Sequence, residues 1–198
     1  MTYLLKYDIN KMSKFKVKKG RKFFCGPRNW LPERNRDGFV AKVLFHHNCV
    51  YRLTDNYDQI NKLTGQSFRL FPFYDKKSKS VKPGHHKDSV RFGWRCLDGE
   101  KIQLLAYVYI NGERKHKELL SVGTGEWVHL KFSETDKFYS FRAMDENGET
   151  SVAKFKKEGS KNGFLGLFIN RLYPYFGGKK AAPHNMQIEL IHIKNEKK

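Results

Sequence analysis

The feature that most constrains the fold is an alternation of apolar and polar residues along short segments. In residues 90–96 every second side chain is apolar, and the same period of two recurs in residues 102–110. This period places successive side chains on opposite faces of a β-strand. No long segment has the 3.6-residue period of an amphipathic helix, and only residues 55–63 predict a short helix, capped by Asp55. The other expected strands are residues 39–45, 127–132, 138–143, 150–155, 164–169 and 186–193.

Turn signals separate these segments and indicate an antiparallel architecture. Asp98-Gly99, Asn111-Gly112 and Asn147-Gly148 are typical hairpin turns, because Asn, Asp and Gly tolerate positive φ. Short strands at a spacing of roughly 10 residues predict an all-β antiparallel sandwich of jelly-roll type with at most short helices. Parallel sheets would need crossover helices. We expect one domain over residues 1–198, with a basic N-terminal strand and arm in 1–38 and the sandwich core in 39–193. Residues 11–22 and 75–82 are expected to be loops or arms.

The register of one hairpin follows from its turn. A two-residue loop at Asp98-Gly99 would put Arg91 on the buried face with Ala106. A three-residue loop, with Gly99 left-handed, instead pairs Trp94 with Leu104 on the buried face. The second register is favoured because it keeps charge out of the core. It gathers a polar set on one open face: Ser89, Arg91, Arg95, Gln103, Tyr107 and Tyr109.

The charge of the chain points to polyanionic partners. Its 198 residues contain 39 Lys+Arg against 20 Asp+Glu, a net charge of +19. Such a field attracts nucleic acid, acidic polysaccharide or acidic protein surfaces. The alternative is that the lysines only keep an aromatic-rich protein in solution. Because no zinc finger, RRM signature or recognition-helix pattern is present, binding to nucleic acid is expected to be non-specific.

Several classes of protein and site are excluded or disfavoured. No apolar run reaches the ~18 residues that cross a bilayer, so no membrane insertion is expected. The N-terminus lacks the pattern of a secretory signal, and three cysteines without a C-x-x-C pair argue against a disulfide framework. These features predict an intracellular or virion-associated protein, unless a leader has been removed. No metal or cofactor is expected, since the eight histidines lack ligand spacing and neither a P-loop nor G-x-S-x-G occurs.

Two segments concentrate residues that can carry chemistry. In residues 83–95, His85 and His86 precede Arg91; imidazole can act as acid or base, and guanidinium can hold a carboxylate or phosphate. Solvated histidines in a loop are the alternative. In residues 171–184, aromatic residues precede Gly177-Gly178 and two lysines, which suits a sugar ring or base with an anionic group. The alternative is that these aromatics close one end of a sandwich. The catalytic candidates are His85, His86, Arg91 and Tyr107. The predicted ligand-binding residues are the polar set of the open face together with Lys179, Lys180 and His184.

The chain resembles a group of mostly uncharacterised bacterial and large-DNA-virus proteins with concanavalin-like or jelly-roll sandwiches. The motifs that carry the resemblance are N-K-L-T-G at 61–65, H-H-K-D-S-V-R-F-G-W-R at 85–95, A-Y-V-Y-I-N-G-E-R at 106–114, and L-Y-P-Y-F-G-G at 172–178 with A-P-H at 182–184. The wider relatives of such sandwiches include lectins, glucanases and polysaccharide lyases, so the resemblance implies glycan binding. Jelly-roll lyases use a Tyr with His and Arg or Gln, which Tyr107, Arg91 and Gln103 echo. Glucanases need paired carboxylates, which the predicted face lacks.

Three functions remain open at this point. The first is a non-catalytic binding module for an anionic polymer, an acidic glycan in particular. The second is a structural or minor capsid-type protein of a viral particle, with particle or oligomer partners. The third is a polysaccharide lyase or phosphodiesterase that uses His85 or His86 with Arg91 and Tyr107.

Overall fold

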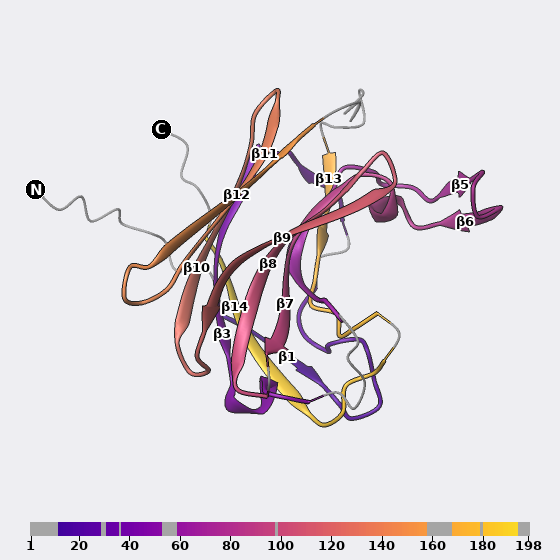
Figure 1. Cartoon of the computed structure of the whole chain (residues 1–198). Coiled ribbons are helices and arrows are strands. Elements are labelled where there is room, and N and C mark those ends of the chain that lie inside the picture. The colour runs from indigo at the N-terminus through magenta and orange to yellow at the C-terminus, as the bar shows by residue number, and fades with distance from the viewer. Residues whose placement is uncertain are drawn as a thin grey trace, which may run out of the picture.

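The computed structural model describes residues 12–28, 31–35, 37–52, 59–97, 99–157, 168–178 and 180–193. Two six-stranded antiparallel sheets pack face to face in it, which confirms the predicted all-β sandwich (Figure 1). In spatial order, sheet A contains β1 (Ser13–Val17), β14 (Met186–Ile193), β3 (Gly38–Phe45), β10 (Trp127–Glu134), β11 (Phe138–Met144) and β12 (Thr150–Lys156). Sheet B contains β2 (Glu33–Arg34), β13 (Phe168–Leu172), β4 (Asn61–Ser67), β7 (Ser89–Leu97), β8 (Lys101–Ile110) and β9 (Glu113–Val122).

A small hairpin and two short 3₁₀ helices complete the described elements. The hairpin consists of β5 (Phe73–Asp75) and β6 (Ser80–Lys82), and it projects from the body of the sandwich (Figure 1). The 3₁₀ helices are η1 (His47–Cys49) and η2 (Gly84–His86), and η2 leads directly into β7. No helix in the described part of the chain is long and apolar enough to span a membrane.

Aromatic side chains from the two inner faces fill the space between the sheets. Trp94 of β7 lies 5.3 Å from Phe45 of β3 between ring centroids, and Phe92 lies 6.1 Å from Phe39. Each pair is tilted or edge-to-face, the arrangement that aromatic rings prefer. The apolar residues of each alternating segment therefore point inward, so the polar residues between them point outward. The outer faces of the two sheets follow directly from the sequence pattern.

Where the structure differs from the sequence-based expectations, packing across the sandwich gives the reason. Asn61–Leu63 of the expected helix lie in strand β4, where Leu63 is fully buried, and residues 53–58 lie outside the described residues. Of the expected loop 11–22, the segment Ser13–Val17 is strand β1, because Phe15 and Val17 pack into the core. Residues 75–82 form the tip of the β5–β6 hairpin. The strand expected at 164–169 is seen as Phe168–Leu172, and residues 164–167 lie outside the described part.

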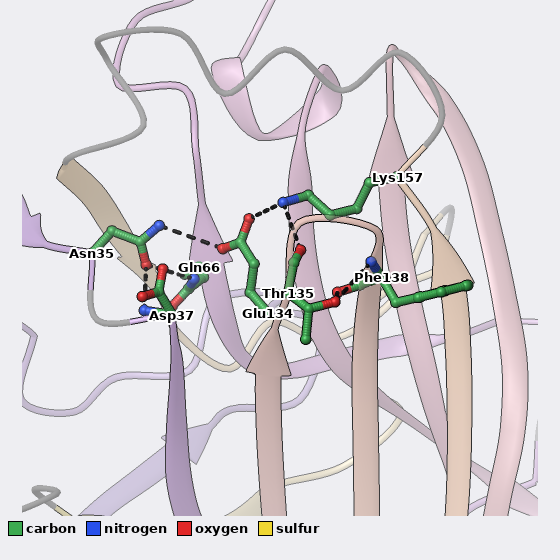
Figure 2. A network of polar contacts seen from close by, with 7 residues as sticks. All are labelled: Asn35, Asp37, Gln66, Glu134, Thr135, Phe138 and Lys157. Atoms are coloured by element: carbon green, nitrogen blue, oxygen red, sulfur yellow. Dashed lines mark hydrogen bonds and ion pairs between the residues drawn. The ribbon is translucent and has the colours of Figure 1, made fainter.

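A polar network ties the two sheets together where β10 ends (Figure 2). Glu134 of β10 accepts a bond of 2.6 Å from Lys157 Nζ and one of 3.4 Å from the Asn35 amide. Asn35 in turn accepts a bond of 3.5 Å from Gln66 of β4, in the other sheet. The side chains of Glu134 and Lys157 are only 6% and 11% exposed. This ion pair is therefore largely buried and is sensitive to the loss of either charge.

Candidate functional site

The outer face of sheet B carries the polar set predicted from the sequence. Arg91 lies opposite Tyr107 in the β7–β8 ladder, and Trp94 lies opposite Leu104. Gly99 has a φ of 74°, as the three-residue loop requires. The predicted register is thus confirmed, and its face points away from sheet A. The remaining members of the set pair as Ser89 with Tyr109 and Arg95 with Gln103.

This face is not open at its centre, contrary to the sequence-based expectation. Arg91 is 8% exposed and Tyr107 is 3% exposed. The cause is a small apolar cluster on the outer face of the sheet, in which Ile60, Leu105 and Tyr107 pack together with Tyr109 against them. Ile60 directly precedes β4, and no local sequence pattern predicts that it packs on Leu105 and Tyr107 of β8. The cluster therefore covers the centre of this face.

Arg91 is the most unusual group of this site. Its guanidinium makes no hydrogen bond and no ion pair with any residue in the described ranges. Burial lowers the pKa of Arg91 to about 10, and the nearby hydroxyls of Tyr107 and Tyr109 oppose that effect only in part. Gly65 allows the close passage of β4 here, since a Cβ at that position would lie 2.7 Å from Arg91 Cα. A buried cation without a counter-ion is a ready site for an anion.

A second cation, the half-buried Lys62, lies beside this site on β4. Its Nζ donates to the carbonyl oxygens of Ile60 at 2.8 Å and Gly177 at 3.2 Å, and it lies 5.3 Å from the ring centroid of Tyr107. Burial, and then the charge of Arg91, lower the pKa of Lys62 to about 8. Sequence reasoning missed Lys62 because the segment was expected to be helical. The match of N-K-L-T-G to the resemblance motif was the only signal that could have found it.

The two adjacent histidines lie at the end of η2, next to the same strands. Burial lowers the pKa of His85 to about 3, and Arg91 and His86 contribute to the shift. Burial and then Arg91 also lower the pKa of His86. The His86 ring stacks on Tyr109, with centroids 5.2 Å apart. Ser89 is buried and donates to the His85 carbonyl oxygen at 2.6 Å, so it positions this turn rather than facing a ligand. Both imidazoles are therefore neutral at pH 7, and His85 in particular is a weak base.

A hollow of about 580 Å³ extends from this point toward the β5–β6 hairpin. Tyr109 and His86 form one wall, and Phe73 of the hairpin contributes to the opposite one. Arg114 of β9, which lies opposite Tyr109 in the ladder, also lines it. The hollow has the size of a small-ligand site, and its lining combines aromatic rings and cations with the carboxylates of Asp75 and Glu113. Arg91 and Lys62 lie outside this lining. Sequence reasoning missed Arg114 because edge strand β9 is mostly exposed and shows no clean alternation.

Other predicted site residues have partners that remove them from this centre. Arg95 donates to Gln103 Oε1 at 2.6 Å and pairs with Glu118 Oε1 at 2.7 Å, so its charge is neutralised. His184 hydrogen-bonds the carbonyl oxygen of Asn48, in η1, at 2.9 Å. The backbone N–H of Lys180 donates to Gln59 Oε1 at 3.0 Å. The structure does not bring these residues together with Arg91. Lys179 lies outside the described residues.

The aromatic segment 171–184 contributes both to the core and to the edge of the site. Phe176 is fully buried and packs 5.2 Å from Tyr51, which agrees with the alternative that this run closes the sandwich. Tyr175 instead exchanges backbone hydrogen bonds with Lys62 and lies 5.0 Å from Phe23, which is 65% exposed. This segment therefore borders the site beside Lys62. Among the described residues, no group of three His, Cys, Asp or Glu side chains is arranged to hold a metal ion.

Comparison with known proteins establishes the fold but no family. The sequence matches no protein-family model, and no curated protein matches it significantly. The alginate lyase from Klebsiella pneumoniae superposes with a TM-score of 0.54 and 11% identity, over 80% of this chain and 59% of that chain, less than two thirds of its length. The marine PL-14 alginate lyase from Aplysia kurodai gives a TM-score of 0.53 and 12% identity, over 91% and 80% of the two chains. The protein has a concanavalin-like β-sandwich fold.

Proposed function

We propose that the protein binds a carboxylated polysaccharide on the outer face of sheet B and cleaves it by β-elimination. The observation that carries the proposal is Arg91, a buried guanidinium without a described partner, next to a second, half-buried cation, Lys62. A carboxylate can accept two parallel hydrogen bonds from a guanidinium. An anionic ligand would offset the cost of burying both charges, which favours binding of a uronate in this position.

The groups around Arg91 can supply the proton transfers of an elimination. Neutralisation of the uronate carboxylate by Arg91 acidifies the adjacent C5–H. His86, neutral at pH 7, takes that proton; the C5–H electron pair forms the C4=C5 double bond as the C4–O4 bond breaks. Tyr109, against which His86 stacks, donates its proton to the leaving O4. Burial and then the neighbouring Tyr109 hydroxyl raise the pKa of Tyr107, which stays protonated as a hydrogen-bond donor.

The acidic residues of sheet B argue against a glycosidase. Strands β4, β7 and β8 contain no Asp or Glu. Glu118 of β9 is ion-paired with Arg95, Glu113 of β9 with Lys115, and Glu33 of β2 with Arg171. Hydrolysis of a glycosidic bond uses two carboxylates that flank it, whereas elimination needs none. Two structures with the same fold are alginate lyases, and alginate is a polymer of uronates, which supports a lyase as the reaction class.

The test is incubation of the purified protein with alginate and other polyuronates while the ultraviolet absorbance of the unsaturated product is followed. We expect activity in the wild type, loss of activity in Arg91→Met, and a large decrease in His86→Ala. His47→Ala is the matched control, since His47 is exposed and bonds Thr124. The absence of product with every polyuronate would contradict the lyase proposal.

A second candidate is the non-catalytic acidic-glycan module, which the exposed Phe23 and the half-buried Tyr175 beside Lys62 favour. Aromatic faces and cations suffice to hold a sugar acid without cleaving it. Retention of the protein by immobilised polyuronate without any product would support this module. A failure of retention as well would leave the particle-protein alternative, for which co-purification of partner chains is the measurement.

A further inference from the structure

Sheet A presents a second group of cations, on the face opposite to the proposed active site. Lys131 of β10 lies directly opposite Arg142 of β11, and both are exposed. Lys154 of β12 is also exposed, two residues from Val152, the cross-strand partner of Arg142. Neither Lys131 nor Arg142 forms an ion pair or side-chain hydrogen bond with a residue in the described ranges. Like charges directly opposite each other destabilise a sheet, unless an anion neutralises them.

Strand β9 connects the proposed site to the edge of the sandwich nearest this group. On β9, His116 lies opposite Tyr107, the partner of Arg91. The next residue, Lys117, is at the edge of the sandwich, and its Nζ donates to the Lys154 carbonyl oxygen at 2.9 Å. This contact joins the edge strands of the two sheets. Lys117 and Lys154 therefore place two cationic side chains along the edge formed by β9 and β12, between the outer faces of the two sheets.

The chemistry of the second surface suits an acidic polysaccharide. Adjacent strands lie about 4.8 Å apart, so cations on neighbouring strands face successive charges of an extended polymer. Two apolar side chains stand among them: Phe138 is 40% exposed and Val152 is 47% exposed. Sugar rings have apolar C–H faces that pack on such side chains, and Phe138 can stack on one. The flat strands offer no helix to enter a DNA groove, which favours glycan over nucleic acid.

We infer that the outer face of sheet A around Lys131, Arg142 and Lys154 is a second, non-catalytic binding surface for the same polyuronate. The inference depends on the proposed function. A polymer long enough to pass the β9–β12 edge contacts both faces, so its binding to one raises its effective concentration at the other. A short oligouronate reaches only the site at Arg91. The surface therefore makes the protein selective for long chains.

The test compares a charge-reversed surface with a control of equal charge change. The first variant is Lys131→Glu with Arg142→Glu; the control is Lys18→Glu with Lys19→Glu, two exposed residues of the basic N-terminal segment. All proteins carry His86→Ala so that cleavage is suppressed. Dissociation constants are measured for long alginate, for duplex DNA and for a short oligouronate at fixed salt. We expect the first variant to lose about tenfold in affinity for long alginate and to keep its affinity for the oligouronate.

Three outcomes would overturn the inference. They are an unchanged affinity of the first variant for long alginate, an equal loss in the control, and a larger loss for duplex DNA than for alginate. The proposed function fails differently, because Arg91→Met would then leave oligouronate binding intact. Loss of oligouronate binding in Arg91→Met together with unchanged alginate binding in the sheet A variant would retain the active site and reject the second surface.

Discussion

Replacing Arg91 with methionine should make the free protein more stable while it abolishes binding of the anion. Methionine has a similar length and packs well in irregular apolar surroundings. In the free protein the guanidinium is buried and has no described counter-ion, so the substitution removes a desolvated charge. It also removes the repulsion between Arg91 and Lys62, whose pKa Arg91 lowers.

The size of the expected stabilisation follows from the lowered pKa of Arg91. Burial lowers the pKa of Arg91 to about 10, and each pKa unit corresponds to ~1.4 kcal/mol, so keeping this group charged costs about 3 kcal/mol. Lost packing of the aliphatic stem against Tyr107 would offset part of the gain, roughly 1 kcal/mol. We therefore expect stabilisation by about 1–3 kcal/mol, the range found when buried charges are replaced by apolar residues.

The assay is urea denaturation of the wild type and Arg91→Met without ligand, followed by calorimetric titration with oligouronate. In a thermal denaturation experiment, a stabilisation of this size would raise the melting temperature by about 2–12 °C for a chain of this length. Destabilisation of the variant by more than 1 kcal/mol would refute the reasoning, because Arg91 would then be a structural group whose charge is compensated in the free protein. The opposite signs expected for stability and binding distinguish a ligand site from a structural arginine.

Three further predictions concern the close approach of β4 to Arg91, the Glu134–Lys157 ion pair and the charge of Lys62. Gly65→Ala should destabilise the protein by about 1–3 kcal/mol and weaken oligouronate binding, because its Cβ would lie 2.7 Å from Arg91 Cα; an unchanged denaturation midpoint would contradict the close approach. Glu134→Gln should cost roughly 1–3 kcal/mol in urea denaturation, since it leaves the Lys157 ammonium, 11% exposed, without its carboxylate; a neutral effect would show that the pair contributes nothing. The pKa of Lys62, about 8, should rise when a carboxylate binds beside it, so binding should take up protons near pH 8–9 and weaken as pH rises through this range. Titration calorimetry in buffers of different ionisation enthalpy measures that uptake, and heats independent of the buffer would exclude it.

Local sequence determined the strands whose two faces meet different environments. Val90, Phe92 and Trp94 alternate with polar residues because one face of β7 meets the core, and the same holds for β8. The register between these two strands also followed from the sequence, since only the three-residue turn with a left-handed Gly99 keeps Arg91 out of the core. The face on which Arg91 and Tyr107 lie was thus predictable.

The tertiary structure decided which segments cover that face and which residues they bring to the site. Strand β4 is buried almost throughout and carries polar residues inward, so its sequence shows no alternation of apolar and polar residues. Strand β9 shows no clean alternation either, because most of its side chains are exposed. Lys62 and Arg114, which these two strands bring to the site, were therefore missed. Ile60 covers Tyr107 from a segment about 45 residues earlier in the chain. Burial depends on which distant segments pack over a residue, and a period of two in the sequence specifies only the side of the strand on which that residue lies.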